Sequence, residues 1–460
     1  MVVSKRLLTC ALLVLALVCT IIVASPMAAA EKVTLRVAIP ADRPENKTAI
    51  EGELEKIKRF EAVYPDIKVV PINYDYNPQT FAVMQAGRNA PDVLLVWATE
   101  GAVLAEKGWL APIDEYLKTW SKTDWINPDA FLPFTVNGRI YGLPHDGYVK
   151  HIMYNKKMFL AKKVPFPRLD WTWKEFMDAA VKLTDRRKGI AGFAPMTRGG
   201  EGGWMLTDWI YQAGGEVEEF RNGKWYAVFD SPEAIRAAQF AKDMKWKYNV
   251  VPANWSQGYM DVFNLFATEK AAMVPHGDFT VEWVINNFKW NPKDIGLAPM
   301  PKGEGPKGRQ AGVQGGTFYV INGLAPQPVR DAAFKWLDFE RWSDAGLEVL
   351  KKDIAERRKT GTYMAMLKYP VLKPGVGYQK KEDEIKAANP DVCVIWPEEL
   401  REYLPKTGHT EPPIEAQKLY SEYLAPVYQA LLSNRNADPA KLLKEAAAKF
   451  QKEVLDPLNK

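Results

Sequence analysis

Four loops of this sequence place an aromatic side chain within a few positions of side chains that hydrogen-bond or carry charge. They are WATE, with Trp97, Thr99 and Glu100; PHDGY, with His145, Asp146 and Tyr148; RGGEGGWMLTD, with Arg198, Glu201, Trp204 and Asp208; and HGDF, with His276, Asp278 and Phe279. A sugar has apolar C–H faces and a rim of hydroxyl groups, so its binding sites pair flat rings with in-plane polar groups. Any one loop is equally typical of a polar turn with an anchoring ring. The four together favour a carbohydrate site.

The sequence lacks the usual patterns of metal sites and of nucleophilic catalysis. None of its four histidines has a second His or Cys at metal-ligand spacing, and it contains neither a G-x-S-x-G elbow nor a P-loop. A literal G-x-G-x-x-G at residues 303–308 contains Pro306 and has no helix signal after it, so we interpret it as a surface turn. We therefore expect no metal, no cofactor and no catalytic residue. A secreted glycoside hydrolase, which needs only two well-placed carboxylates, is the principal enzymatic alternative.

The first thirty residues have the pattern of an export signal. Lys5 and Arg6 precede an almost wholly apolar run at residues 7–23, and Ala28 and Ala30 form an A-x-A cleavage pattern. We expect residues 1–30 to be a signal peptide cut after Ala30, with an uncleaved anchor as the alternative. The protein is therefore predicted to be exported, to the periplasm or to the outer face of the cytoplasmic membrane.

Composition narrows the class of protein further. Cys10 and Cys19 lie in the leader, so Cys393 alone remains and no intrachain disulfide is expected, which fits a bacterial envelope. The net charge of +5 falls to +3 when Lys5 and Arg6 leave, and no basic block indicates nucleic acid. No later apolar run is long enough to span a bilayer. The 16 tryptophans exceed what a core needs, which suggests flat surfaces for stacking.

Strand and helix signals alternate along the first part of the mature chain. Residues 32–39 alternate apolar and polar side chains as a strand does, and apolar side chains at helical spacing follow until Pro65. Residues 66–70 and 91–97 are short apolar runs typical of buried strands, and the next helix signal ends at Gly108. This order predicts an α/β domain with a largely parallel sheet.

Later segments continue the same alternation. Thr172 with Glu175 has the pattern of a capping box, and Ser231 followed by Pro232 marks another helix start. Short strands are expected between the later helices, and no internal repeat or low-complexity linker divides the chain. In an open α/β sheet, ligands bind at loops beyond the carboxyl ends of the strands, where WATE stands.

Six segments, in a fixed order over some 300 residues, resemble those of a known family. They are PDVLLVWATEGAVLAEKGWLAPI, NGRIYGLPHDGYVKHIMYNKKMF, WTWKEFMDAAVKL, FATEKAAMVPHGDF, IGLAPMPKGEG and GGTFYVINGLAPQPVRDAAFKWLDF. Together they resemble the extracytoplasmic sugar-binding proteins of ABC importers, the maltose-binding-protein-like family of solute-binding proteins. The resemblance covers nearly all of the mature chain and implies a two-lobed periplasmic-binding-protein fold of the α/β class. In that fold, hinge-linked lobes close over a ligand in an interlobe cleft.

The resemblance implies that each lobe is assembled from separate chain segments. We expect an N-terminal lobe at residues 31–142 plus about 318–375, and a C-terminal lobe at residues 143–317 plus about 376–460. The segment YGLPHDGY would be the first crossing between the lobes. The second crossing is expected near Gly316, and the third near VLKPGVG.

The resemblance also implies which side chains face the ligand. Trp204 stands where the family places a stacking aromatic, and Phe279 stands where the family usually has Trp. No clear counterpart exists for a stacking aromatic near the C-terminus, and Trp396 is our candidate for it. The complete set of expected ligand-binding residues is Asp42, Arg43, Trp97, Thr99, Glu100, His145, Asp146, Tyr148, Trp204, Asp278, Phe279, Gly316 and Trp396.

From these observations we expect a binding protein for a carbohydrate, either a disaccharide or a short oligosaccharide. Its other partners would be the membrane permease subunits of an ABC importer, and we expect a monomer with no nucleic-acid partner. One alternative is a charged or phosphorylated solute, because Arg43, Arg198 and Arg309 have the charge to bind a phosphate. The other is the secreted glycoside hydrolase.

Overall fold

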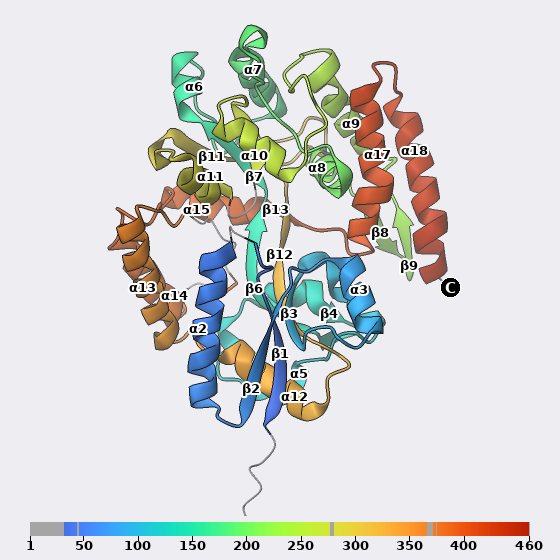
Figure 1. The fold of residues 1–460 in the computed structure, drawn as a ribbon. Helices are drawn as coiled ribbons and strands as arrows, with labels where there is room; N and C mark the ends of the chain where they lie inside the picture. The colour runs from blue at the N-terminus through green and yellow to red at the C-terminus, as the bar shows by residue number, and fades with distance from the viewer. Residues whose placement is uncertain (1–31, 44–45, 277–279, 366–370, 374, 460) are drawn as a thin grey trace, which may run out of the picture.

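A computed structural model describes residues 32–43, 46–276, 280–365, 371–373 and 375–459. The described chain forms two lobes, one above the other in Figure 1. The lower lobe contains the N-terminal strands and helix α12 (Gln327–Asp338), and the upper lobe contains most of the middle of the chain with the C-terminal helices. Two long strands, β6 (Gly142–Val149) and β12 (Gly312–Ile321), run between the lobes. The two-lobed α/β fold expected from the sequence is confirmed.

Parallel strands with alternating apolar side chains form the centre of the N-terminal lobe. Strand β1 (Val33–Ile39) pairs in parallel with β2 (Ile67–Asn73) and with β3 (Val93–Trp97). Leu35 and Val37 of β1 are buried, as the sequence alternation predicts. Apolar side chains cover both faces of the sheet, because Val93 packs in one buried cluster and Leu94 packs in another.

The sheet of the N-terminal lobe is mixed rather than largely parallel. Within the described residues it has six strands, in the order β13-β12-β3-β1-β2 with β6 paired to β12. Strand β12 runs antiparallel to β3 and to β6, whereas β13 (Gly408–Thr410) pairs with β12 in parallel. The difference from the prediction arises at the crossings, because β6 leaves the lobe while β12 returns to it. Apolar runs in a sequence do not encode these directions.

The C-terminal lobe contains a small antiparallel sheet covered by helices. Strand β7 (His151–Asn155) lies between β10 (Met273–His276) and β11 (Ile295–Pro299), and all five of its residues are buried. Helices α8 (Gly199–Gln212) and α10 (Tyr259–Ala267) pack against the same apolar core. The lobe therefore has one large core of its own.

Helix starts and stops follow the local signals in the sequence. Helix α2 (Lys47–Val63) ends two residues before Pro65. Helix α7 (Trp173–Leu183) begins with the predicted capping box, in which Thr172 and Glu175 satisfy each other's backbone N–H groups. These side-chain-to-backbone contacts are local, which is why the sequence alone predicted them.

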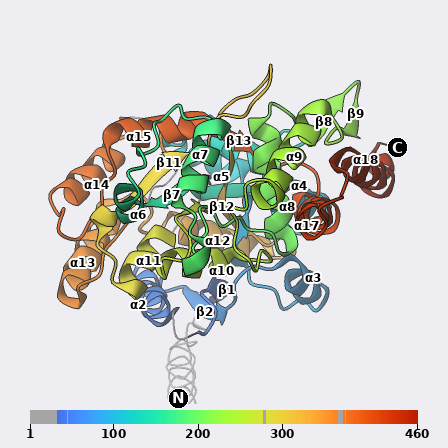
Figure 2. The same cartoon turned by 90° about the horizontal axis from the view of Figure 1, so that it is seen from above.

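The C-terminal third of the chain packs on both sides of the molecule. Helices α13 (Asp344–Thr360) and α14 (Gly377–Ala387) lie on one side, and α17 (Ala425–Ser433) and α18 (Pro439–Phe450) lie on the opposite side (Figure 2). Val371 and Leu372 pack with the N-terminal lobe, whereas Trp396 and the helices after it pack in the core of the C-terminal lobe. The exact lobe boundaries stay a prediction.

Further helices and two hairpins belong to the described chain. The helices are α3 (Pro78–Ala86), α4 (Gly101–Glu106), α5 (Asp114–Thr119), α6 (Lys156–Ala161), α9 (Pro232–Trp246), α11 (Thr280–Phe288), α15 (Glu398–Tyr403), α16 (Ala416–Lys418), the π-helix η8 (Leu419–Leu424) and α19 (Asp456–Leu458). The hairpins are β4 (Thr135–Val136) with β5 (Arg139–Ile140), and β8 (Glu218–Arg221) with β9 (Lys224–Ala227). In the part of the chain that the structure describes, no helix has both the length and the apolar character to cross a bilayer.

Candidate ligand-binding cleft

A cavity of about 930 Å³ lies between the lobes, beside the crossing strands. This volume is within the range of about 300–1,000 Å³ that small-molecule sites occupy. Its described lining comes from both lobes and consists of Trp97, Ala98, Thr99, Asp146, Gly147, Tyr148, Arg198, Gly199, Gly200, Glu201, Trp204, Tyr259, Gly316, Thr317, Glu411, Gln417 and Tyr420. Aromatic rings and groups that hydrogen-bond therefore face the same space.

The end of strand β3 supplies the wall from the N-terminal lobe. Trp97 is the last residue of the strand and is 37% exposed, and the Tyr76 ring packs edge-on against it at 5.3 Å between centroids. Behind this wall, the buried Glu100 carboxylate accepts hydrogen bonds from Tyr76 Oη at 2.5 Å and from Thr99 Oγ1 at 3.1 Å. Burial raises the pKa of Glu100. Glu100 therefore fixes the loop from behind and is not part of the cavity lining.

The crossing strands supply the back of the cavity. The Asp146 carboxylate accepts hydrogen bonds from the backbone N–H of Thr317 at 3.1 Å and from its hydroxyl at 2.7 Å, which ties β6 to β12. Gly316 is required at this point because a Cβ atom there would lie 2.3 Å from the carbonyl oxygen of Asp146. Tyr148 is two residues beyond Asp146 and faces the same side, as alternation along a strand requires.

Helix α8 supplies the wall from the C-terminal lobe. Trp204 lies on the second turn of this helix, and the edge of its ring meets Tyr148 at 5.9 Å between centroids. Beneath it, the Nζ atom of the buried Lys150 lies 3.6 Å from the Trp204 ring centroid. Glu201 accepts the backbone N–H of Tyr259 at 2.5 Å, which holds Tyr259 at the cavity. Lys150 thus supports the Trp204 ring from behind, and Glu201 holds the backbone of Tyr259.

The segment after β13 supplies a third group of lining residues. The Glu411 carboxylate accepts hydrogen bonds from Tyr148 Oη at 3.2 Å, from Trp204 Nε1 at 3.2 Å and from Tyr420 Oη. Gln417 donates its side-chain amide to Thr99 Oγ1 at 3.1 Å, so this hydrogen bond joins the two lobes across the cavity. The lobes are therefore in contact through lining residues.

Carboxylates predominate over cations in the described lining. Asp146, Glu201 and Glu411 are acidic, and Arg198 is the only basic residue among those that line the cavity. The Arg198 guanidinium forms an ion pair with Asp261 at 2.7 Å, so its positive charge is already compensated within the protein. Burial raises the pKa of Glu201, and it raises the pKa of Glu411 to about 7. The site is therefore rich in hydrogen-bond acceptors and poor in available positive charge.

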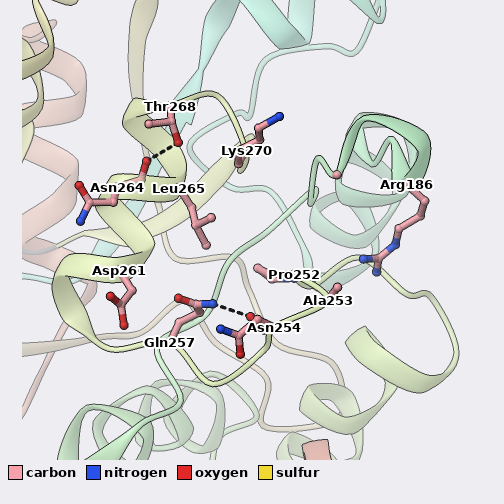
Figure 3. A pocket seen from close by; sticks show the side chains of 11 residues that line it. Arg186, Pro252, Ala253, Asn254, Gln257, Asp261, Asn264, Leu265, Thr268 and Lys270 are labelled. Carbon is pink, nitrogen blue, oxygen red and sulfur yellow. Dashed lines mark hydrogen bonds between the residues drawn. The ribbon is translucent and has the colours of Figure 1, made fainter.

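A second cavity, of about 560 Å³, lies on the C-terminal lobe alone (Figure 3). Its lining includes Arg186, Asn254, Gln257, Asp261 and Lys270 and contains no aromatic ring among the described residues. The charged groups there already have partners within the protein, because Arg186 donates to Asn249, Asp261 pairs with Arg198, and Lys270 donates to the carbonyl of Lys188. We therefore take the interlobe cavity as the candidate site.

Comparison with known protein families identifies the chain's family. The profile of the family described as "Bacterial extracellular solute-binding protein" matches residues 45–339, which include both crossing strands and most of the described cavity lining. The chain belongs to this family. The family comprises solute-binding proteins rather than enzymes, and it agrees with the resemblance inferred from the sequence.

Individual relatives are distant. An uncharacterized ABC transporter extracellular-binding protein of Pyrococcus horikoshii is 26% identical over 59% of this chain and 61% of its own length, which is less than two thirds of it. A maltotriose-binding protein of Pyrococcus abyssi is 24% identical over 74% of this chain and 70% of its own length. A solute-binding protein of Thermotoga lettingae, solved with alpha-D-tagatose, superposes with a TM-score of 0.69 at 24% identity, over 92% of this chain and 99% of its own. The structural likeness supports the two-lobed fold of this solute-binding protein.

The structure brings six of the thirteen expected ligand-binding residues to the cavity lining. These are Trp97, Thr99, Asp146, Tyr148, Trp204 and Gly316. Their contacts with a ligand stay predictions. Glu100 lies directly behind them, and Asp278 and Phe279 fall outside the described residues.

The other four expected residues lie away from the cavity lining. His145 is the extra residue of a β-bulge, because Thr317 pairs with Asp146 whereas the next residue of β12 pairs with Pro144. It contacts Arg341 and Tyr319 instead. Arg43 is paired with Asp75 at the surface, and its neighbour Asp42 is exposed. Trp396 is buried in the core of the C-terminal lobe.

Sequence reasoning missed the lining residues that come from the C-terminal part of the chain. Glu411 stands before two prolines and Tyr420 stands in an apolar helical run, so each has an ordinary loop or core explanation. The expected aromatic from this part of the chain was Trp396, but Tyr420 is the ring that lines the cavity. Arg198 and Glu201 belong to the same loop as Trp204 but are not among the expected binding residues. No cluster of potential metal ligands occurs among the described residues.

Proposed function

We propose that this solute-binding protein captures a carbohydrate between its lobes and delivers it to the permease subunits of an ABC importer. The observation that carries the proposal is the convergence of aromatic rings and carboxylates on one interlobe cavity. Trp97 comes from one lobe and Trp204 from the other, while Asp146 lies at the crossing between them. Rings bind the C–H faces of a sugar and carboxylates accept its hydroxyl groups.

The size and charge of the cavity support a neutral oligosaccharide. About 930 Å³ is near the upper end of the usual range for small-molecule sites, which favours two or more sugar rings over one. A phosphorylated solute would need available cations, but Arg198 is paired with Asp261 and Arg309 is paired with Glu216 at 2.5 Å. Arg43 is paired with Asp75 at the surface. The charge distribution therefore disfavours an anionic ligand.

The family and the predicted leader support a proposal for the cellular arrangement. We propose that residues 1–30 are removed on export and that the mature protein works as a monomer at the outer side of the cytoplasmic membrane. Its lobes would divide near residues 142, 317 and 375, as predicted from the sequence. The relative from Pyrococcus abyssi is named a maltotriose-binding protein, which supports a sugar as the transported solute.

A thermal-shift screen tests this function. The purified protein is heated with maltotriose, maltose, tagatose, mannitol, other saccharides and glycerophosphocholine, each in large excess. A ligand at about a hundred times its dissociation constant should add about 2.7 kcal/mol to the free energy of unfolding, which raises the melting temperature by a few degrees. Recovery of the sugar is then measured by chromatography.

The screen has three informative outcomes. A shift with an oligosaccharide that is recovered unchanged supports the proposed function. A shift with glycerophosphocholine or another phosphate ester alone would reject the carbohydrate in favour of a charged solute. Cleavage of an oligosaccharide would reject the binding protein in favour of a hydrolase.

A further inference from the structure

Glu411 occupies a position that joins the crossing strands to the cavity. It is the first residue after β13, and its backbone N–H donates to the carbonyl oxygen of Gln314 on β12 at 3.2 Å. Strand β13 is itself held to β12 by parallel pairing. The backbone of Glu411 is therefore fixed to the crossing, while its carboxylate lines the cavity.

The Glu411 carboxylate connects three aromatic residues that line the cavity. One carboxylate oxygen accepts the hydroxyl of Tyr148 and the indole N–H of Trp204, each at 3.2 Å, and the other oxygen accepts the hydroxyl of Tyr420. These residues come from β6, α8 and η8, and they are separated from Glu411 by 263, 207 and 9 positions in the sequence. The carboxylate is thus a hydrogen-bond acceptor that all three aromatic side chains share.

Two glycines leave room for this arrangement. A Cβ atom at Gly315 would lie 2.5 Å from Tyr148 Oη and 2.9 Å from a Glu411 oxygen. A Cβ atom at Gly203 would lie 2.2 Å from the carbonyl oxygen of Tyr420, so α8 approaches η8 closely only because this residue has no side chain. Real Cβ contacts are not this short. The backbones of β12 and α8 can therefore approach the aromatic residues and the Glu411 carboxylate this closely only because these two residues are glycines.

Other charged and titratable groups face the same carboxylate. They are Tyr148 and Lys150 from β6 and its end, Asp208 and Tyr211 from α8, and Tyr420 from η8. Burial raises the pKa of Glu411 to about 7, although the hydrogen bond from Tyr420 and the charge of Lys150 oppose the rise. A buried carboxylate that is charged only at the cost of folding stability is typical of functional sites.

We infer that Glu411 is the positioning residue of the cleft, whose carboxylate fixes Tyr148, Trp204 and Tyr420 as one aromatic wall for the ligand. The inference rests on the proposed function for the identity of the ligand, but the contacts that define it exist without one. In its charged form the carboxylate accepts all three hydrogen bonds. Protonation removes the negative charge of the acceptor, so the hydrogen bonds that the carboxylate accepts, including the one from Trp204, weaken.

A spectroscopic titration tests the inference without a ligand. The indole N–H of Trp204 gives one signal in a ¹H–¹⁵N spectrum, identified by its loss in Trp204→Phe. We expect this signal to move with a midpoint near pH 7 in the wild-type protein and to stop moving in Glu411→Gln. Tyr420→Phe should raise the midpoint, because it removes a donor that stabilises the carboxylate.

Glu218→Gln is the matched control. Glu218 is another buried carboxyl group of the same lobe with a raised pKa, but its hydrogen bond comes from the backbone of Ile414. This variant should leave the Trp204 titration unchanged. A Trp204 signal that stays still in the wild-type protein, or that titrates equally in Glu411→Gln, would overturn the inference. If Glu411→Gln does not fold, the midpoint in Tyr420→Phe decides, and an unchanged midpoint rejects the role.

A binding measurement with maltotriose as the probe adds the functional readout. Glu411→Gln should bind it about tenfold more weakly at a pH of about 8, and only the wild-type affinity should fall as the pH drops through 7. Equal affinities, or the same pH profile in both proteins, would contradict the positioning role. Failure of maltotriose to bind the wild-type protein would count against the proposed function for this sugar, while the Trp204 titration still decides the role of Glu411.

Discussion

Lys150 and Asp208 form an ion pair in which both side chains are completely buried. Lys150 follows the crossing strand β6, and Asp208 lies on helix α8 one turn after Trp204. Asp208 also accepts the backbone N–H of Val313 at 2.8 Å, so the pair links α8 to both crossing strands. The Lys150 ammonium lies against the Trp204 ring, which connects this structural pair to the cleft.

Breaking this pair should destabilise the protein strongly. Lys150→Met leaves the Asp208 carboxylate buried without its counter-ion, and such changes cost about 3–5 kcal/mol of the free energy of unfolding. Urea denaturation measures the loss. The control is Lys441→Met, which removes an exposed pair with Glu445 at 3.9 Å and should cost less than about 0.5 kcal/mol. Equal effects of the two substitutions would show that the buried pair contributes no more to the free energy of unfolding than an exposed pair does.

Removal of the Trp204 ring should weaken carbohydrate binding without unfolding the protein. Trp204→Ala removes a stacking surface that lines the cavity, and the affinity for an oligosaccharide such as maltotriose should fall by about 1–3 kcal/mol. Isothermal titration calorimetry measures this change. Trp225→Ala, on the β8–β9 hairpin outside the described cavity lining, is the control and should leave the affinity unchanged. An unchanged affinity in Trp204→Ala would remove this ring from the site.

Sequence reasoning succeeded where the determinants are local. The capping box of Thr172 and Glu175 and the alternation along β1 depend on residues a few positions apart, and both are present in the structure. Asp146 lies on the strand that runs between the lobes, as the family resemblance of the segment YGLPHDGY implied. The neighbouring His145 was expected to face the same cleft, but it is the extra residue of a β-bulge and lies away from the cavity lining. The residue types around it do not predict a bulge.

The part of the site that could not be predicted depends on contacts between distant segments. Glu411 meets Trp204 across 207 positions, and Gln417 meets Thr99 across 318. Each of these polar residues also fits an ordinary surface loop when its own neighbours alone are considered. Only the folded arrangement of β13 beside β12 brings the C-terminal segment to the cavity. The six segments that carry the family resemblance lie within residues 91–339, so they gave no indication of the lining residues Glu411, Gln417 and Tyr420.

Two glycine substitutions in helices should have opposite effects on stability. Gly203→Ala forces a Cβ atom to within 2.2 Å of the Tyr420 carbonyl oxygen and should cost about 1–3 kcal/mol or more, because backbone must move. Gly52 lies inside α2, and outside the helix's own backbone nothing described lies within 4 Å of its Cβ position, so Gly52→Ala should stabilise the protein by about 0.5–1 kcal/mol. Thermal and urea unfolding measure both. Destabilisation by both substitutions alike would mean that the close approach of α8 to η8 is not what constrains Gly203.

Stability should fall on the alkaline side because of Glu218. This buried carboxyl group accepts one hydrogen bond, from the backbone N–H of Ile414 at 3.0 Å, and burial raises its pKa from 4.5 to about 8. The folded protein therefore holds the proton more tightly than the unfolded chain does. The resulting stability is fully present below a pH of about 4.5 and is lost as the pH rises through about 8.

Glu218→Gln isolates this contribution, since the amide keeps the acceptor for Ile414 and cannot titrate. The free energy of unfolding of the wild-type protein relative to the variant should decrease by about 4 kcal/mol between about pH 5 and about pH 9. Urea denaturation at a series of pH values measures the difference. Glu445→Gln, on the exposed face of α18, is the control and should follow the wild-type protein throughout. If Glu218→Gln shows the same pH dependence of stability as the wild-type protein, the Glu218 carboxyl group has the same pKa in the folded protein as in the unfolded chain.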